Sequence, residues 1–195
     1  LRTSRLLLRE FRADDFDAAR EYDPDPEVQR FRRGSPLPEE ETRSYLQTAE
    51  QWAQQAPRTH YAFAVTLPPC DAVIARLTLG LNNDEIREWE IGWLVQRAHW
   101  GCGIATEAAR ASLRFAFETL NAHRVVAFCQ IENTASWRVM EKLGMLREGR
   151  IREVQWRPPD GWKDEYVYSI LDREWPLSAH LGGMTDDGRR TTADD

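Results

Sequence analysis

A glycine-containing segment in the middle of the chain has the residue types of an anion-binding site. A predicted strand ends at Val95, a predicted helix begins at Gly103, and Gly101 lies in the loop between them. Glycine lets a backbone turn sharply and approach a ligand, and the free N–H groups of a first helical turn attract negative charge. A Gly-x-Gly pair by itself more often marks a plain tight turn. The segment therefore indicates an anion site without establishing one.

The longer fingerprints of nucleotide-phosphate sites are absent from the sequence. It contains no Gly-x-x-x-x-Gly-Lys followed by Ser or Thr, and no third glycine completes Gly-x-Gly-x-x-Gly. The first pattern marks a mononucleotide P-loop and the second a Rossmann dinucleotide site. Both kinds of site are therefore disfavoured.

Glu90 is a candidate general base. It shares one face of the predicted strand 88–95 with Glu88, and the opposite face carries Trp89, Ile91 and Trp93. A carboxylate can take a proton from an amine when burial raises its pKa. Periodicity alone, however, favours an ordinary carboxylate on the surface of a strand.

Asn133 and Ser136 mark the start of a short predicted helix at residues 134–143. Asparagine is a favoured N-cap residue because its side-chain oxygen accepts a hydrogen bond from a free backbone N–H group. Helix capping is enough to explain both polar residues at this stage.

The histidines and cysteines are too scattered for a metal centre or a Ser/His/Asp arrangement. No two cysteines have Cys-x-x-Cys spacing, which argues against a zinc site and a disulfide framework and favours a reducing cytoplasm. We therefore expect no metal and a cytoplasmic location. The residues concerned are His60, His99, His123, His180, Cys70, Cys102 and Cys129.

Strands and helices in a mixed order must position these residues. Apolar and alternating runs predict strands at residues 5–12, 60–67, 73–81, 88–95 and 124–131, with two more flanking the turn at 158–161. Helical periods extend over 38–56, 103–120 and 134–143, and Asp14 and Asp15 are placed to cap a further helix near Ala18. The order strand, helix, strand between 88 and 131 favours a crossover with parallel strands. The fold class is α/β (α+β).

The overall charge limits the classes of partner. The chain has 195 residues, 26 Lys plus Arg against 32 Asp plus Glu, and a formal net charge of −6, which disfavours nucleic acid and anionic membranes. The apolar run Leu6–Leu8 is too short for a signal sequence or a membrane span. Composition predicts one domain at 1–180 and a polar tail at 181–195.

Three motifs in order resemble the acyl-CoA core of the GCN5-related N-acetyltransferase (GNAT) superfamily. They are Glu90-Ile-Gly-Trp-Leu-Val95, Trp100-Gly-Cys-Gly-Ile-Ala-Thr-Glu-Ala108 and Asn133-Thr-Ala-Ser-Trp-Arg-Val-Met-Glu-Lys-Leu-Gly-Met145. The opening Thr3-Ser-Arg-Leu-Leu-Leu-Arg9 and the Trp-Gly-x-Gly form are similar to the RimJ/RimL branch, which acetylates N-terminal amines of ribosomal proteins. The resemblance covers about residues 3–175. It implies the GNAT fold, a mixed and mostly antiparallel central sheet of six to seven strands with helices on both faces.

The resemblance also implies that acetyl-CoA binds at the anion site as acyl donor. Backbone N–H groups of the loop and helix start would hold its pyrophosphate, those of Gly101, Cys102, Gly103, Ile104, Ala105 and Thr106. The pantetheine arm would meet Asn133 and, through a local splay between neighbouring strands, the backbone of Leu94 and Val95. Trp100 would wall the cofactor, and Arg97 is either a phosphate partner or a solvated loop charge.

For catalysis, the resemblance implies direct attack by the amine in a ternary complex, with no cysteine nucleophile at Cys102. The position of Glu90 within Glu-Ile-Gly favours it as the base, acting directly or through water. Many members carry a tyrosine general acid where this chain has Met140, which cannot transfer a proton. Ser136, one turn into the helix and implied to face the CoA sulfur, is therefore the leading general-acid candidate.

The sequence thus predicts an N-acetyltransferase acting on a primary amine, with a peptide or ribosomal-protein N-terminus as the favoured acceptor. One alternative is the same fold acting on a small amine or using another acyl-CoA. A second is a CoA-binding sensor module without turnover, which the methionine at position 140 keeps open. A homodimer is compatible with the sequence.

Overall fold

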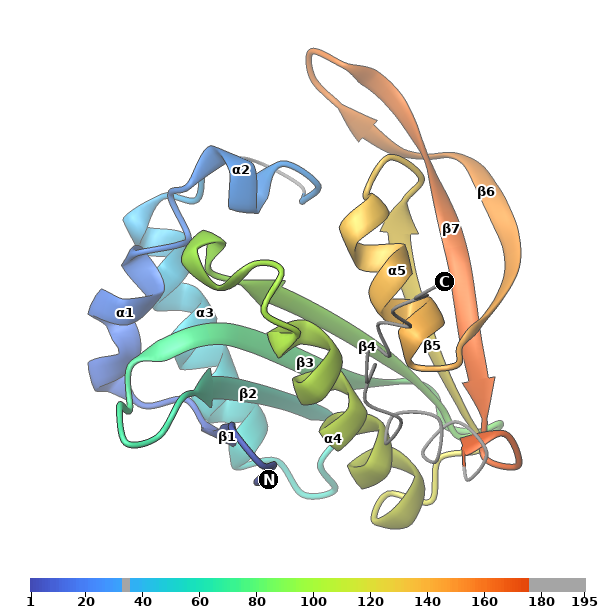
Figure 1. Ribbon diagram of the computed structural model, residues 1–195, viewed down its shortest axis with the longest axis horizontal. Coiled ribbons are helices and arrows are strands. Elements are labelled where there is room, and N and C mark those ends of the chain that lie inside the picture. The colour runs from blue at the N-terminus through green and yellow to red at the C-terminus, as the bar shows by residue number, and fades with distance from the viewer. Residues whose placement is uncertain (33–35, 176–195) are drawn as a thin grey trace, which may run out of the picture.

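The computed structural model describes residues 1–32 and 36–175 of the chain. A seven-stranded sheet runs through this part in the order β1-β2-β3-β4-β5-β7-β6 (Figure 1). Its strands are β1 (Leu7–Glu10), β2 (His60–Thr66), β3 (Val73–Asn83), β4 (Glu88–Val95), β5 (Arg124–Gln130), β6 (Leu146–Arg157) and β7 (Gly161–Leu171). The helices are α1 (Phe16–Arg20), α2 (Pro26–Gln29), α3 (Glu39–Ala53), α4 (Ile104–Glu118) and α5 (Thr134–Lys142), with 3-10 turns at Ala13–Asp15 and Arg97–His99.

An apolar layer lies on each face of the sheet. Successive side chains of a strand point to opposite faces, so β3 and β4 contribute to both layers. On the face covered by α4 and α5, Leu79 and Ile91 pack in one cluster with Leu113. On the face covered by α1 and α3, Leu94 packs in a second cluster with Leu46. Figure 1 shows α4 in front of the sheet and α3 behind it.

The parallel pair β4–β5 is short and opens towards one end. Three pairs join the two strands, Glu88↔Arg124, Trp89↔Val125 and Glu90↔Val126, whereas β4 continues to Val95 and β5 to Gln130. The strands diverge beyond this contact (Figure 1). The other neighbouring strands pair antiparallel. The predicted crossover and the predicted splay are both confirmed.

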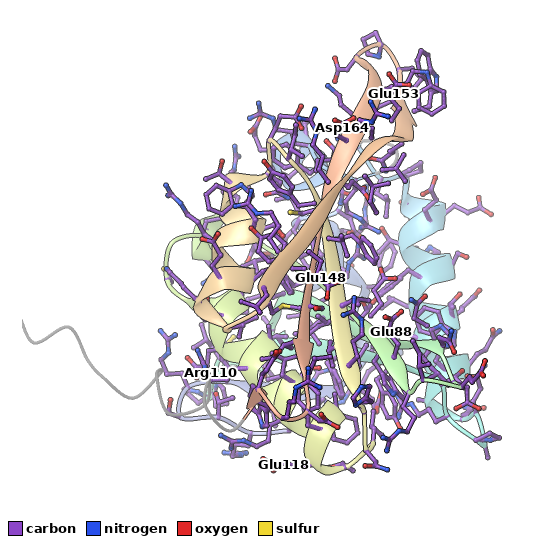
Figure 2. All side chains as sticks on the ribbon, turned by 90° about the vertical axis from the view of Figure 1, so that its right-hand side faces the viewer. Glu88, Arg110, Glu118, Glu148, Glu153 and Asp164 are labelled. Carbon is purple, nitrogen blue, oxygen red and sulfur yellow. The ribbon has the colours of Figure 1, made fainter. Side chains whose placement is uncertain are left out.

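Arg124 on β5 links strand β4 to the β6–β7 hairpin through hydrogen bonds. Arg124 donates from Nε to Glu88 on β4 at 2.7 Å and from Nη2 to Glu148 on β6 at 2.5 Å. The Ser169 hydroxyl of β7 donates to Glu148 at 2.7 Å. Figure 2 labels both carboxylates, together with Glu153 and Asp164 near the far end of the hairpin. Four neighbouring strands are therefore linked across the end of the sheet where β4 and β5 meet.

The sheet has seven strands, with helices on both faces, as predicted. Two details differ from the prediction. The third helix ends at Ala53 rather than at residue 56, because Pro57 disfavours helical backbone just before it. Asp15 is the N-cap residue of α1, as predicted, but its side chain makes no capping hydrogen bond to this helix. It accepts hydrogen bonds from the backbone N–H of Arg12 at 2.8 Å and from the Arg9 guanidinium at 2.7 Å. The predicted tail at 181–195 lies outside the described residues. Within residues 1–32 and 36–175, no helix is long and apolar enough to cross a membrane.

Candidate active site

A cleft of about 570 Å³ lies where β4 and β5 diverge. Side chains and backbone from β3, β4, β5, α4, α5 and the α2 segment line it. The sequence-predicted residues on its wall are Leu94, Val95, Trp100, Gly101, Gly103, Ile104, Ala105, Thr106, Asn133 and Ser136. Glu90, Arg97 and Cys102 are not among the described residues that line it.

The loop before α4 has the conformation of an anion cradle. Gly101 and Gly103 have φ of 75° and 77°, a left-handed conformation that other residues seldom adopt. Gly103 is the N-cap of α4, so the first-turn N–H groups of Ile104, Ala105 and Thr106 have no intrahelical partner. A Cβ atom at Gly101 would meet nothing within 4 Å, which leaves room beside the backbone. These residues fit a bound phosphate group.

Arg5, which the sequence interpretation did not select, holds this loop in place. Its Nη1 donates to the Cys102 carbonyl at 3.1 Å, and its Nε donates to Glu107 on the first turn of α4 at 2.7 Å. The Thr3 hydroxyl donates to the same carboxylate at 2.5 Å. Thr3 and Arg5 belong to the Thr-Ser-Arg opening, so a signal was present in the sequence, but the partner residues lie about a hundred positions away.

Trp100 closes one side of the cleft through a hydrogen bond to β4. Its indole Nε1 donates to the Val95 carbonyl at 2.7 Å. The side chain remains 47% exposed, so one ring surface is available to a ligand. Cys102 is also exposed, with its Sγ 3.5 Å from the Trp100 carbonyl.

Arg97 is paired with an acidic residue of the α2 segment. Its Nε lies 3.0 Å from Asp25 Oδ2, and Asp25 caps α2 by accepting from the Glu27 N–H at 3.0 Å. This ion pair joins the loop after β4 to α2. The role of Arg97 as a phosphate partner stays a prediction.

Glu90 faces a group of acidic side chains. Partial desolvation raises its pKa above the ordinary glutamate value, and the negative charges of Glu165 and then Glu88 raise it further. The Glu90 side chain is exposed, so a substrate amine can approach it. A carboxylate with a raised pKa and solvent access has the properties of a general base.

The start of α5 provides the opposite wall of the cleft. The Asn133 side chain accepts a hydrogen bond from the Ser136 N–H at 3.1 Å, which confirms the predicted cap. Ser136 is half-buried and lines the cleft. Met140, 1% exposed, lies on the same wall. Ser136 is thus the hydroxyl that α5 offers to the cleft near its N-terminus.

Cys129 on β5 also lines the cleft. Burial raises the pKa of the Cys129 thiol to about 12, so it stays protonated at neutral pH. In residues 1–32 and 36–175, no group of three or more His, Cys, Asp or Glu side chains could hold a metal ion.

The comparisons with known proteins agree with this geometry. Residues 5–146 match the family described as "Acetyltransferase (GNAT) domain". The uncharacterized N-acetyltransferase YnaD of Bacillus subtilis is 36% identical over 175 residues, which cover 89% of this chain and 97% of YnaD. A GNAT-family acetyltransferase structure from Bacillus anthracis has a TM-score of 0.79 at 33% identity and covers 89% of this chain and 99% of its own.

A third similar structure is Mycobacterium smegmatis RimJ in complex with CoA-disulfide, with a TM-score of 0.77 at 24% identity, covering 90% of this chain and 87% of RimJ. At that identity the likeness concerns the fold. The family match spans the glycine loop, the splayed strands and α5, the three features that form the cleft. The chain belongs to the GNAT superfamily and is an acetyl-CoA-dependent N-acetyltransferase.

Proposed function

We propose that this enzyme acetylates the N-terminal amine of a peptide or ribosomal protein, by direct attack of the amine on acetyl-CoA in a ternary complex. Acetyl-CoA would supply the acetyl group as an activated thioester. Its pyrophosphate would bind the first-turn N–H groups of α4, and its pantetheine arm would lie between β4 and β5 near Val95 and Asn133. The RimJ/RimL-like motifs favour a protein N-terminus as acceptor.

The observation that carries the proposal is the acidic face beside the cleft. Glu88, Glu90 and Glu165 lie close enough together for the charges of Glu88 and Glu165 to raise the pKa of Glu90. A group of like charges favours a cation, and an amine acceptor arrives as an ammonium ion. The anion cradle and a cation-attracting face therefore flank one cleft.

Two side chains of this chain would move protons in the reaction. Glu90 would take a proton from the ammonium, directly or through one water molecule, to give the nucleophilic amine. Ser136 would donate a hydrogen bond and then a proton to the departing sulfur, and its oxygen would take a replacement proton from solvent. The Ser136 hydroxyl comes from α5 and the Glu90 carboxylate from β4, so the two groups lie on opposite sides of the gap between β4 and β5.

An acceptor screen tests the proposal. The enzyme is incubated with acetyl-CoA and either a pool of peptides with different N-terminal residues or a pool of small amines, and products are identified by mass spectrometry. We expect N-terminally acetylated peptides and equal release of CoA thiol. Acetylation confined to polyamines or other small amines would overturn the peptide acceptor, and CoA binding without thiol release would favour a sensor module.

A further inference from the structure

Buried polar atoms without hydrogen-bond partners gather on one side of the cleft. In the described part of the chain eight buried side-chain nitrogen or oxygen atoms make no hydrogen bond, and seven of them belong to Tyr22, Asp23, Gln29, Arg32, Tyr45 and Arg76. The Asp23 atom among them is in ion-pair contact with Arg76. Buried polar groups in folded proteins are nearly always satisfied. Three of these residues, Arg32, Tyr45 and Arg76, line the cleft. The cluster therefore leaves donors and acceptors available to a polar group that enters the cleft.

Arg76 is the centre of this cluster. It is 4% exposed, and its guanidinium lies 4.5 Å from the centre of the Tyr45 ring. Its Nη1 is 3.3 Å from Asp23, whose other oxygen accepts from the Thr42 hydroxyl at 2.8 Å. Its Nη2 has no partner among the described residues. One of the two terminal nitrogens of the Arg76 guanidinium is therefore available to donate a hydrogen bond to a ligand.

The two tyrosines add neutral donors. Burial raises the pKa of Tyr22 and of Tyr45 well above the usual range, so both hydroxyls stay protonated near neutral pH. The Tyr45 hydroxyl has no partner in the described chain, and neither has Nη1 of Arg32. Phenol and guanidinium groups donate hydrogen bonds to negatively charged oxygen.

Arginines outnumber their carboxylate partners around the cluster. Arg76 is 3.3 Å from Asp23, Arg30 is 3.8 Å from Glu27 and Arg97 is 3.0 Å from Asp25. Arg32 also lines the cleft, and its Nη1 makes no hydrogen bond in the described part of the chain. Guanidinium groups suit planar carboxylates, which they bind through paired N–H donors. Asp23 already places one negative charge beside Arg76, which favours a singly charged carboxylate over a doubly charged phosphate as the ligand group.

We propose that Arg76, with Tyr45 and Arg32, binds a carboxylate carried by the acceptor. The inference rests on the proposed acetyl transfer to an amine and adds a second recognised group on the same molecule. Arg76 is opposite Leu94 and Glu90 is opposite Gly80 in the β3–β4 register, so both side chains project from the same face of the sheet. On this face, the acceptor's ammonium group would bind near Glu90 and its carboxylate would bind near Arg76.

The spacing limits the acceptor. Arg76 and Gly80 are four residues apart on β3, about 13 Å along the strand. The long side chains of Arg76 and of Glu90, which is opposite Gly80, can shorten that span. The carboxylate of an acidic second residue in a peptide, or that of a small amino acid, can supply the negative group.

Matched acceptors test the proposal. Two peptides that differ only by Glu or Gln at position 2, and one amino acid with its free carboxylate or as the amide, are compared by kcat/KM at saturating acetyl-CoA. We expect each carboxylate acceptor to be favoured by about ten-fold or more, the range of a hydrogen bond between charged groups. Preference in only one pair identifies whether the carboxylate comes from a peptide side chain or from a small amino acid.

Variants assign the preference to the cluster. Tyr45→Phe removes a hydroxyl that makes no hydrogen bond in the described chain, so Tm should not fall, while KM for the carboxylate acceptor rises several-fold and KM for the amide does not. Arg76→Lys keeps the charge opposite Asp23 but loses the planar fork, and should remove most of the preference. Arg114→Met, on the exposed surface of α4, is the matched control and should keep it.

Two results would overturn the inference, and they differ. If carboxylate and amide acceptors are used equally by the wild type, the carboxylate site is wrong while the acetyltransferase proposal stands. If no tested amine is acetylated, the proposed function is wrong, and calorimetric titration of the Glu and Gln peptides against the enzyme with CoA decides the site separately. Equal affinity for the two peptides would then reject it, and tighter binding of the Glu peptide that Tyr45→Phe abolishes would support it.

Discussion

Glu90 shows how neighbouring side chains can prepare a carboxylate for base catalysis. Glu165 lies on β7 and Glu88 on β4, and both charges raise the Glu90 pKa. Of the two, Glu165 raises the pKa more. Glu88 is also 2.7 Å from Arg124. The acidic character of the face therefore depends on residues from two strands, β4 and β7.

Replacing Glu90 tests its role as base. We expect Glu90→Gln to lower kcat by about a hundred-fold or more, the usual contribution of a general base, without changing the Kd for acetyl-CoA. Steady-state kinetics and calorimetric titration give the two values. A matching decrease in affinity would mean that Glu90 organises the site instead.

The pH profile gives a second test at the same residue. Because the base must be ionised, kcat/KM should fall as pH decreases through the raised pKa of Glu90. Removing the neighbouring charge in Glu165→Gln should lower that pKa and move the acid limb to lower pH. If the decrease of kcat/KM at low pH occurs at the same pH in Glu165→Gln as in the wild type, a group other than Glu90 controls it.

Ser136 is tested by removing its hydroxyl. Ser136→Ala should lower kcat while leaving the affinity for acetyl-CoA nearly unchanged, because Asn133 accepts from the Ser136 backbone N–H and not from its side chain. Rapid-quench measurement of a single turnover would separate chemistry from product release. An unchanged single-turnover rate would exclude Ser136 as the acid.

At the scale of elements, the N-terminal segment and α4 form one unit. Thr3 and Arg5 bond to Glu107 and to the glycine loop, so a segment before β1 stabilises the start of a helix after β4. Partial desolvation opposes ionisation of Glu107, yet the hydrogen bonds from Thr3 and Arg5 together lower its pKa. The anion cradle thus depends on contacts from outside its own sequence motif.

Arg5→Ala should weaken acetyl-CoA binding about three- to ten-fold, the effect of losing roughly 1 kcal/mol of hydrogen bonding at the loop. The Kd from calorimetric titration is the measurement. Arg114→Ala, an exposed arginine on α4, should leave the Kd unchanged. Equal effects of the two variants would mean that only general positive charge matters.

The sequence predicted most strands and helices because each has its own period. The alternation in β4 and the apolar stripe of α4 are local properties, and so are the glycines of the loop. Arg76 shows what the sequence could not predict. It stands as a single charge within Val73-Ile-Ala-Arg-Leu77, which signals an unusual buried group, but its partners Asp23 and Tyr45 come from the α1–α2 connection and α3. Contacts between distant segments have no local period to reveal them.

At the scale of the whole molecule, charge is balanced between distant segments. The sequence between 96 and 157 has ten basic and six acidic residues. Several of its arginines pair with acids outside it, as Arg97 does with Asp25 and Arg124 with Glu88. The acidic and basic parts of the chain are therefore interleaved, and the ion pairs link α2 and β4 to the cofactor side.

The free energy of unfolding at low pH should depend on the ion pair between Arg124 on β5 and Glu148 on β6. Arg124 lowers the pKa of Glu148 to about 2, so this carboxylate stabilises the folded state above its ordinary pKa and loses the effect as pH falls towards 2. Glu148 is largely solvent-accessible, so we expect Glu148→Gln to cost no more than about 1 kcal/mol. Urea unfolding should show the difference at pH 7 and much less of it near pH 2.5. An equal difference at both pH values would assign the loss to packing.

The short contact between β4 and β5 divides the sheet into two halves, β1–β4 and β5–β7–β6, joined by three residue pairs and the crossover through α4. Backbone N–H groups of β4 that point towards β5 beyond Glu90 have no strand partner in the described part of the chain. In deuterated water they should exchange quickly, and the addition of CoA should slow them. The pantetheine arm of CoA would then accept hydrogen bonds from these β4 N–H groups, as a neighbouring strand does elsewhere in the sheet, but only while CoA is bound.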